Sequence, residues 1–526
     1  EREVINYLFT VSAKYKPQFK SSLRDLNHSL PSTALRRILD HHKVLLDMSA
    51  GRQARRIVIV TAGTLGDVQP FVALGNRLQK GGWDVLLNAS PAHEAFVRRA
   101  GINFSANPPV NTGFQSPSAA TSKPASEHIP ASKCFNSLSF IQASAWREDS
   151  DWYQSRFQHL VSLCQGADLI ICQAFLILGM VSSVAQLHSI PLIAVEIYPV
   201  IPSTQVQCCM TPFWFQKILK HLTPGLPALV KGKLLYSTYY WFYIRRQWGY
   251  EHSRLNKLRL QYALPPASRH SMYTDNRFVK GVICAWSQML IPVDNNKICK
   301  IVPGFFVTTS VNGKLSCNIT EFLSSGSKPI CFGWGSFSKV FDLSNIFNLA
   351  VMTTYNTQQR AIVLHGSATT EAVNDFLHTL PAHLFNYAKE NILFEQFAPH
   401  QLLFPQCILS IHAGGAGTTG DGLKAGIPQL ITPILYEQMI WQEALVRLRI
   451  CIPLSPLQTV TPTSLSVAVE RILANKLYSY RAKTYRSLFH ESSGLQATDH
   501  FLQDVMQEPL VSDDVCLRNL NMSHQV

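Results

Sequence analysis

The run HAGGAGTTGDGLKAGIP, residues 412–428, decides the fold that we expect of this chain. It follows a short apolar strand, predicted at residues 407–411, and it opens a helix. Three of its glycines let the backbone approach a ligand closely, because no Cβ stands in the way: Gly414, Gly415 and Gly417. The free N–H groups and the positive end of the helix dipole favour an anion at such a helix start.

Two residues limit this helix at its other end. Gly426 suits the left-handed conformation that ends a helix, and Pro428 prevents continuation. Glycine-rich turns also occur where two backbones merely pack closely, so the glycines alone leave both interpretations open. The sequence after the run favours the ligand site.

That sequence is PILYEQMIWQEALV, residues 433–446. The two runs together resemble the nucleotide-sugar signature of the GT-B UDP-glycosyltransferases. The likeness is greatest to the branch of sterol and lipid 3-beta-glucosyltransferases, whose pattern reads roughly HHGGxGTTxxGLxAGxPxxxxPxxxDQxxW. Gln438 and Trp441 match that pattern, whereas Ala413 replaces its second His and Glu437 replaces its Asp.

A second signature lies near the other end of the chain. An apolar strand at residues 57–61 precedes AGTLGDVQPFVALGNRLQKGGWDVLL, which predicts a glycine-rich turn, a helix at 68–80 and a strand at 84–88. The segment GTLGDVQP resembles the GSRGDVQP element of the same family, with Leu65 in place of its Arg. Two such β–α–β starts imply an α/β protein of the GT-B type, with two facing Rossmann-like domains and a cleft between them.

The length of 526 residues fits two domains of about 200–250 residues with tails. We expect a basic N-terminal extension at 1–54, with one helix at 32–47. An acceptor-binding domain comes next at 55–306, with a mobile loop at 105–137. A UDP-sugar-binding domain then occupies 307–526, and its first strand is predicted at 329–332. In the resembled fold the last helix crosses back to the first domain.

Charge and composition narrow the class of partner. The net charge of +14 is dispersed and no nucleic-acid motif accompanies it, so we expect no nucleic acid but peripheral contact with an anionic membrane. Basic and aromatic residues alternate over 217–259, including Trp241, Phe242 and Trp248. This stretch is either an amphipathic helix with a solvated basic face, or part of an acceptor pocket or a surface that touches lipid headgroups.

Cysteine usage and hydropathy indicate a cytoplasmic protein. The twelve cysteines show no spacing typical of metal ligands and fit a reducing compartment. The most apolar stretch, residues 169–202, contains Gln173, Glu196 and Pro191. A strand at 169–172, a helix at 178–187 and a strand at 192–196 explain it without a bilayer.

The resemblance implies inverting transfer of glucose from UDP-glucose to a hydroxyl of a sterol or similar apolar acceptor. Another lipid, polyketide-like or phenolic acceptor, or a non-catalytic UDP-sugar-binding relative, remains an alternative. We expect no cofactor and no metal, since no DxD pair follows a strand. The donor would be held at its phosphates by His412, Thr418, Thr419 and Ser336, at its nucleoside by Phe397, Pro399 and His400, and at its sugar by Glu437 and Gln438.

The third requirement of transfer is a base for the acceptor hydroxyl, and Asp67 is the candidate. It ends the first-domain turn that contains Gly63, Thr64 and Gly66. A buried carboxylate has a raised pKa and is a better base. The competing interpretation is a helix N-cap, a place where Asn serves about as well as Asp.

Overall fold

The computed structural model describes residues 55–108, 150–200, 237–267, 278–294, 299–307, 314–335, 343–366, 368–491 and 494–507. Residues 56–526 belong to one unit, which contains both sheets of the fold. The helix expected at 32–47, most of the loop at 105–137 and residues 201–236 lie outside the described residues.

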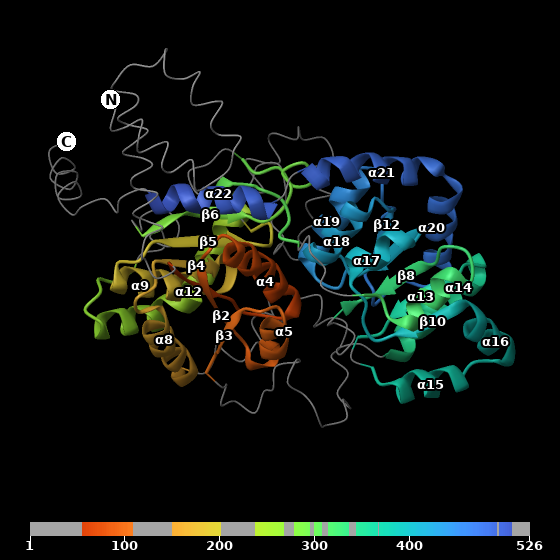
Figure 1. Ribbon diagram of the computed structural model, residues 1–526, viewed down its shortest axis with the longest axis horizontal. Coiled ribbons are helices and arrows are strands. Elements are labelled where there is room, and N and C mark those ends of the chain that lie inside the picture. The colour runs from red at the N-terminus through yellow and green to blue at the C-terminus, as the bar shows by residue number, and fades with distance from the viewer. Residues whose placement is uncertain are drawn as a thin grey trace, which may run out of the picture. The chain divides into compact units, whose positions relative to one another are not determined.

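The first sheet has seven parallel strands in the order β3-β2-β1-β4-β5-β6-β7. Figure 1 labels β2, β3, β4, β5 and β6 of this sheet. The strands are β1 (Arg56–Val60), β2 (Asp84–Ala89), β3 (Asn103–Ala106), β4 (Leu169–Gln173), β5 (Leu192–Glu196), β6 (Val279–Cys284) and β7 (Cys299–Ile301). The helices between them are α4 (Leu65–Lys80), α5 (Glu94–Arg99), α8 (Ser150–Cys164), α9 (Ala174–His188) and α12 (Ser237–Gln261). The predicted βαβ start is therefore present, with α4 beginning three residues earlier than the sequence pattern indicated.

The second sheet has five parallel strands in the order β10-β9-β8-β11-β12. They are β8 (Ile330–Gly333), β9 (Ala361–Leu364), β10 (Ile392–Glu395), β11 (Leu409–His412) and β12 (Gln429–Ile431). The helices with this sheet are α13 (Cys317–Ser324), α14 (Leu343–Thr357), α15 (Thr370–His378), α16 (Ala382–Asn391), α17 (His400–Leu403), α18 (Ala416–Ala425), α19 (Tyr436–Arg447), α20 (Pro462–Ala474) and α21 (Lys476–Glu491). The two parallel sheets confirm the predicted pair of Rossmann-like halves; the boundary at 306/307 stays a prediction.

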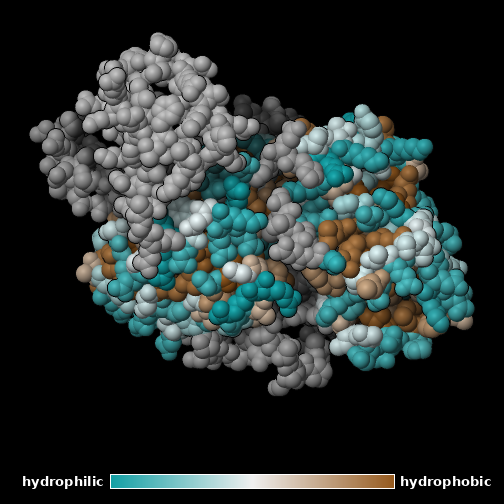
Figure 2. All heavy atoms as spheres, in the orientation of Figure 1, coloured by the Kyte–Doolittle hydropathy of each residue, from teal (hydrophilic) through white to brown (hydrophobic). Residues whose placement is uncertain are grey.

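Strand β1 shows why the sequences of these strands are continuous apolar runs. Its alternate side chains enter two different cores: Val58 and Val60 pack with α8 and α9, whereas Ile57 and Ile59 pack with α4. A parallel sheet is buried on both faces, so neither face of the strand tolerates polar side chains. On the face seen in Figure 2, hydrophilic residues cover much of the described surface and hydrophobic ones show between them.

The apolar stretch at 169–202 forms β4, α9 and β5 of this sheet, as expected. In the described part of the chain, no helix combines the length and the apolar character that crossing a bilayer requires. The sheet order places β4 beside β1 and β5 beside β4, so the carboxyl ends of these strands meet at one edge. That edge carries the first-domain part of the site.

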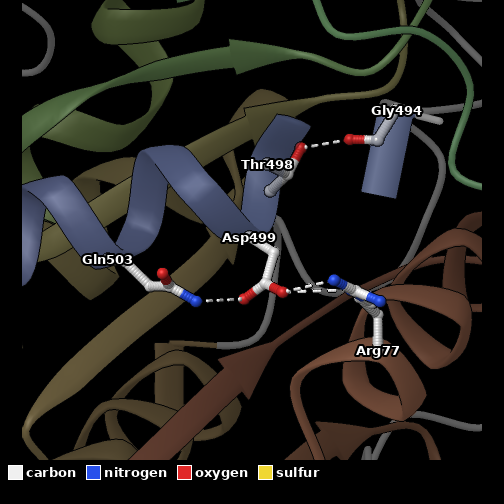
Figure 3. A network of polar contacts seen from close by, with 5 residues as sticks. All are labelled: Arg77, Gly494, Thr498, Asp499 and Gln503. Atoms are coloured by element: carbon white, nitrogen blue, oxygen red, sulfur yellow. Dashed lines mark hydrogen bonds and ion pairs between the residues drawn. The ribbon is translucent and has the colours of Figure 1, made fainter. Parts of the chain in front are cut away.

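The last described helix, α22 (Gly494–Gln507), returns to the first sheet, as the resemblance implied. Leu495 and Leu502 lie in the same core as Ile57 and the buried face of α4. Asp499 accepts from Arg77 of α4, with Nη2 at 2.9 Å, and also from Gln503 of its own helix (Figure 3). The C-terminal helix α22 therefore packs against α4, the helix that begins at the predicted catalytic turn.

Candidate active site

The glycine loop between β11 and α18 leaves the start of α18 open. Gly414 has a φ of +90° and a Cβ there would lie 2.6 Å from Ile431, so this position needs glycine. A Cβ at Gly415 or Gly417 would meet no atom of the described chain within 4 Å. The first-turn N–H groups of α18 are thus accessible to an anion, which the helix dipole favours.

The other end of α18 agrees with the prediction. Gly426 has a φ of 71° and forms the left-handed C-cap, and its N–H bonds the carbonyl oxygens of Gly422 and Leu423. Pro428 comes before β12. The helix is therefore short and fixed at both ends, so its N-terminus has a defined direction.

His412 lies behind this loop and is buried. Its Nδ1 accepts the N–H of Gly414 at 3.0 Å, so its proton lies on Nε2, which donates to Gln429 Oε1 at 2.8 Å. Burial lowers the pKa of His412 to about 4, which keeps the ring neutral. Both ring nitrogens are engaged, and the ring holds the loop in shape.

The two threonines of the loop differ in accessibility. Thr418 is half-buried at the open start of α18. Thr419 is fully buried, and its hydroxyl has no hydrogen-bond partner among the described residues. Thr418 is therefore the better placed of the two to reach a phosphate.

Asp421 is a buried carboxylate of α18 that the sequence analysis missed. Its Oδ2 lies 3.7 Å from His400 Nδ1, and its Oδ1 has no hydrogen-bond partner within the part of the chain described. The sequence feature that could have identified Asp421 is a carboxylate on the inner side of a glycine-rich helix. Asp421 joins α18 to the turn predicted to border the nucleoside.

That turn presents flat surfaces. Phe397 is 70% exposed, which is unusual for a large aromatic side chain. Pro399 precedes α17, and His400 stacks on Phe404 with ring centroids 4.6 Å apart. These side chains suit stacking against a planar base. Ser336, expected near the phosphates, lies outside the described residues.

Glu437 and Gln438 stand in the first turn of α19. Gln438 Oε1 accepts the N–H groups of Ile434 and Leu435 at 2.6 and 3.0 Å, which leaves its amide nitrogen to meet a ligand. Glu437 is half-buried, and burial raises the pKa of its carboxyl to about 8. The helices that begin at the two glycine-rich turns, α4 and α18, are in contact.

Asp67 is only 6% exposed and accepts four hydrogen bonds. Its Oδ2 accepts from the N–H and the hydroxyl of Thr64 at 2.6 and 3.0 Å. Its Oδ1 accepts from Gln173 Nε2 at 3.3 Å and from the Tyr198 hydroxyl. Burial raises the pKa of Asp67, and the bonds from Tyr198, Thr64 and Gln173 oppose that rise.

The N-cap interpretation of Asp67 is wrong in detail. Thr64 is the N-cap of α4, and Asp67 is the third helical residue, whose carboxylate reaches back to the Thr64 N–H. Gly63 has a φ of +108°, and a Cβ there would clash with this carboxylate. The exposed turn of Gly63, Thr64 and Gly66 therefore has the shape that the Asp67 carboxylate requires.

Gln173 and Tyr198 are the partners that the sequence analysis did not find. Gln173 ends β4 and Tyr198 comes after β5, so both belong to the carboxyl ends of strands on the same side of β1. Gln173 Oε1 also accepts the Ala62 N–H at 3.0 Å. A polar residue directly after a buried strand was the available signal, because ligands of open α/β sheets bind at these ends.

The part of the basic and aromatic stretch that the structure describes lies in α12 (Ser237–Gln261), and residues 217–236 lie outside the described residues. Arg259 of α12 is not on a solvated face. It is buried and donates to Ser183 Oγ at 2.7 Å, Gln186 Oε1 at 2.8 Å and the Pro265 carbonyl at 2.8 Å. Trp248 is half-buried, and the side chains of Trp241 and Phe242 lie outside the described residues. Contact of this helix with lipid stays a prediction.

No group of three or more His, Cys, Asp or Glu side chains in the described ranges is arranged to hold a metal ion. The seven cysteines that the structure describes are free thiols.

Comparison with known proteins finds two family models that match parts of the chain. Residues 57–200 match the model of the glycosyltransferase family 28 N-terminal domain. Residues 378–490 match that of the erythromycin biosynthesis protein CIII-like C-terminal domain. The first match contains Asp67, and the second contains the α18 loop and Glu437.

Two relatives illustrate the range of glycosyltransferases to which this chain is similar. The O-mycaminosyltylonolide 6-deoxyallosyltransferase of Streptomyces fradiae is 23% identical, over 81% of this chain and 92% of the relative. A sterol 3-beta-glucosyltransferase of Arabidopsis thaliana is 24% identical, over 85% of this chain and 67% of the relative.

Solved structures share the fold. The calicheamicin glycosyltransferase CalG4 aligns with a TM-score of 0.58 at 15% identity, over 86% of this chain and 98% of that one. The glycosyltransferase VinC, solved in complex with dTDP, aligns with a TM-score of 0.56 at 15% identity, over 86% and 99%. These likenesses confirm the predicted GT-B architecture.

Proposed function

Because this chain belongs to the GT-B glycosyltransferases, we propose that it is an inverting enzyme that moves glucose from UDP-glucose to a hydroxyl of a sterol or similar apolar alcohol. The observation that carries the proposal is the contact between α18, which begins at the donor loop, and α4, which begins at the acceptor-side turn. It brings the donor motif beside the turn that carries Asp67, where sugar and acceptor must meet.

The donor is bound by the second sheet. The diphosphate lies against the open N–H groups at the start of α18, with the Thr418 hydroxyl beside it, and the base stacks on Phe397. The helix N-terminus stabilises the charge that develops on the leaving diphosphate. The Glu437 carboxyl and the Gln438 amide nitrogen hold the sugar hydroxyls.

Asp67 is the general base. Since both of its oxygens already accept hydrogen bonds, the acceptor hydroxyl reaches it either by displacing Gln173, whose bond of 3.3 Å is the longest, or through the Tyr198 hydroxyl. In the second route Tyr198 passes its proton to Asp67 as it takes the proton of the acceptor. Burial supports this role because it raises the pKa of the carboxyl.

The acceptor is apolar and hydroxylated. The names of the relatives include a sterol glucosyltransferase and a transferase that acts on a macrolide, so the alternative is a polyketide-like, phenolic or other lipid acceptor. Transfer takes place in the cytoplasm, with peripheral binding to anionic membranes that the net charge of +14 supports.

A transfer screen tests the proposal. The full chain is incubated with UDP-glucose, UDP-galactose or dTDP-glucose and with sterols, macrolide aglycones, hydroxy fatty acids or phenolics, and products are detected by mass spectrometry. We expect a hexosylated sterol from UDP-glucose, with a β-anomeric proton coupling in NMR that reports inversion. If only macrolides are glycosylated, the alternative of a polyketide-like acceptor is supported. If the protein binds a UDP-sugar but forms no product, the alternative of a non-catalytic relative is supported.

A further inference from the structure

Arg156 of α8 is a buried cation that lacks a counter-ion among the described residues. The side chain is 2% exposed, its Nη2 donates to the Thr61 carbonyl oxygen at 3.1 Å, and its guanidinium carbon lies 5.4 Å from the ring centre of Trp152. Its Nε has no hydrogen-bond partner in the same part of the chain. No salt bridge joins it to a described carboxylate, and the charge interaction that acts on it there comes from Tyr153.

This arrangement is costly for the protein alone. Removing a guanidinium from water is unfavourable even after the surroundings relax. One hydrogen bond to a neutral carbonyl and one cation–π contact offset only part of that cost. Burial lowers the pKa of Arg156 only to about 10, so the side chain stays charged at neutral pH. The described residues therefore offset only part of the free-energy cost of burying the Arg156 charge.

The surroundings of Arg156 place it at the ligand-binding edge of the first sheet. Thr61 comes directly after β1 and precedes the turn that carries Asp67. The N–H of Thr61 bonds the carbonyl of Asn88 in β2 at 2.9 Å. Open parallel sheets bind their ligands beyond the carboxyl ends of the strands, which is where this guanidinium lies.

A second unsatisfied polar group lies at the same strand ends. Asn88 is fully buried, and its Oδ1 has no partner in the described parts of the chain. Its amide nitrogen bonds Ser105 of β3 at 3.2 Å and lies 3.4 Å from His159 Nε2. His159 and Arg156 lie three residues apart on α8, so their side chains share one face of that helix.

We propose that Arg156 binds a carboxylate of the acceptor, so that within the proposed class of apolar alcohols the preferred acceptors are acids, such as a hydroxylated fatty acid or steroid acid. This inference rests on the proposed function for the identity of the ligand as an acceptor. A bidentate pair with the guanidinium satisfies Nε and supplies the missing charge.

A matched pair of probes tests this without relying on catalysis. Binding of a hydroxystearate and of its methyl ester to the full chain is measured by calorimetry below their micelle concentrations. The two probes carry the same hydroxyl and chain and differ in the charge. We expect the acid to bind roughly 10- to 100-fold more tightly, the range for a hydrogen bond to a charged group.

Variants then locate the effect. Arg156→Gln should remove the preference for the acid and leave affinity for the ester unchanged, whereas Arg156→Lys should keep part of the preference. Arg98→Gln is the control, because Arg98 belongs to the same domain, has a side chain that is 56% exposed and pairs with Glu94. It should keep the full preference.

Equal affinity of the wild type for acid and ester, no binding of the acid, or a preference that survives in folded Arg156→Gln overturns the proposal. If Arg156→Gln does not fold, the wild-type comparison and Arg156→Lys still decide. Transfer of glucose to the hydroxystearate and to a neutral sterol is measured in parallel. Failure of transfer to both beside intact acid binding contradicts the proposed function and leaves the carboxylate site standing. Transfer to either one beside equal acid and ester affinities contradicts the site alone.

Discussion

Replacing Asp67 by Asn separates a catalytic base from a structural acceptor. The carboxylate accepts two bonds from Thr64 at Oδ2 and bonds from Gln173 and Tyr198 at Oδ1. An Asn side chain has one oxygen and one NH₂, so in either orientation one pair of donors faces an amide nitrogen. Leaving a buried donor unsatisfied costs about 1–3 kcal/mol. We therefore expect lower stability, in contrast to the small change that an N-cap would give.

The effect on catalysis should be much larger. Removing a general base lowers turnover by roughly 10²–10⁴-fold, whereas affinity for UDP should stay the same because the groups that bind the donor belong to the second sheet. Turnover is measured by mass spectrometry, UDP affinity by calorimetry and stability by thermal unfolding. All three are measured at a temperature where the variant is folded.

A matched control is Thr369→Ala. The Thr369 hydroxyl caps α15 by accepting the Ala372 N–H at 3.2 Å, far along the chain from both motifs, and losing such a cap costs about 1 kcal/mol. This variant should lose stability and keep its turnover. If folded Asp67→Asn keeps a near wild-type rate, or loses UDP affinity while the chemical step survives, the carboxylate is structural and the base lies elsewhere.

Five further predictions address the donor loop and its pH dependence, the metal, the membrane and the returning helix. His412→Ala should weaken transition-state binding of the donor by roughly 2–4 kcal/mol, through loss of the bond that fixes Gly414; an unchanged rate in the folded variant removes the ring from the site. Burial lowers the pKa of His412 to about 4, so between about pH 6.5 and 4 the unfolded chain binds a proton there that the folded protein does not. The difference in the free energy of unfolding between wild type and this variant, measured by urea titration, should therefore decrease as the pH falls through that range. Transfer should persist in excess EDTA, and a loss restored by magnesium contradicts the phosphate role of α18. Vesicle binding should rise with anionic lipid and fall with salt, since exposed charges are screened over about 8–10 Å; equal binding to neutral vesicles refutes it. Asp499→Asn breaks the ion pair with Arg77 and should lower the melting temperature and donor turnover together, with Arg98→Gln unchanged as the comparison.

Local sequence determined the elements that form the two halves. The apolar run before residue 62 and the glycines after it specify a strand and a turn through backbone freedom and side-chain burial, which are properties of neighbouring residues. Gly426 ended its helix as expected for the same reason. The boundaries shifted where a side chain from elsewhere joined in: α4 begins at Leu65 because Asp67 completes its first turn by reaching back to Thr64.

The tertiary structure decided what each polar side chain does. The pattern of residues 412–428 places His412 at a strand tip, but only packing against Gln429 shows that the ring faces inward. Gln173 and Tyr198 lie more than 100 residues from Asp67 in sequence and reach it because β4 stands beside β1 and β5 beside β4. Arg156 and Arg259 look alike in the sequence, yet within the described residues Nε of Arg156 has no hydrogen-bond partner, whereas all three side-chain nitrogens of Arg259 donate. Burial and hydrogen bonding depend on which strands and helices become neighbours, and composition and spacing do not contain that information.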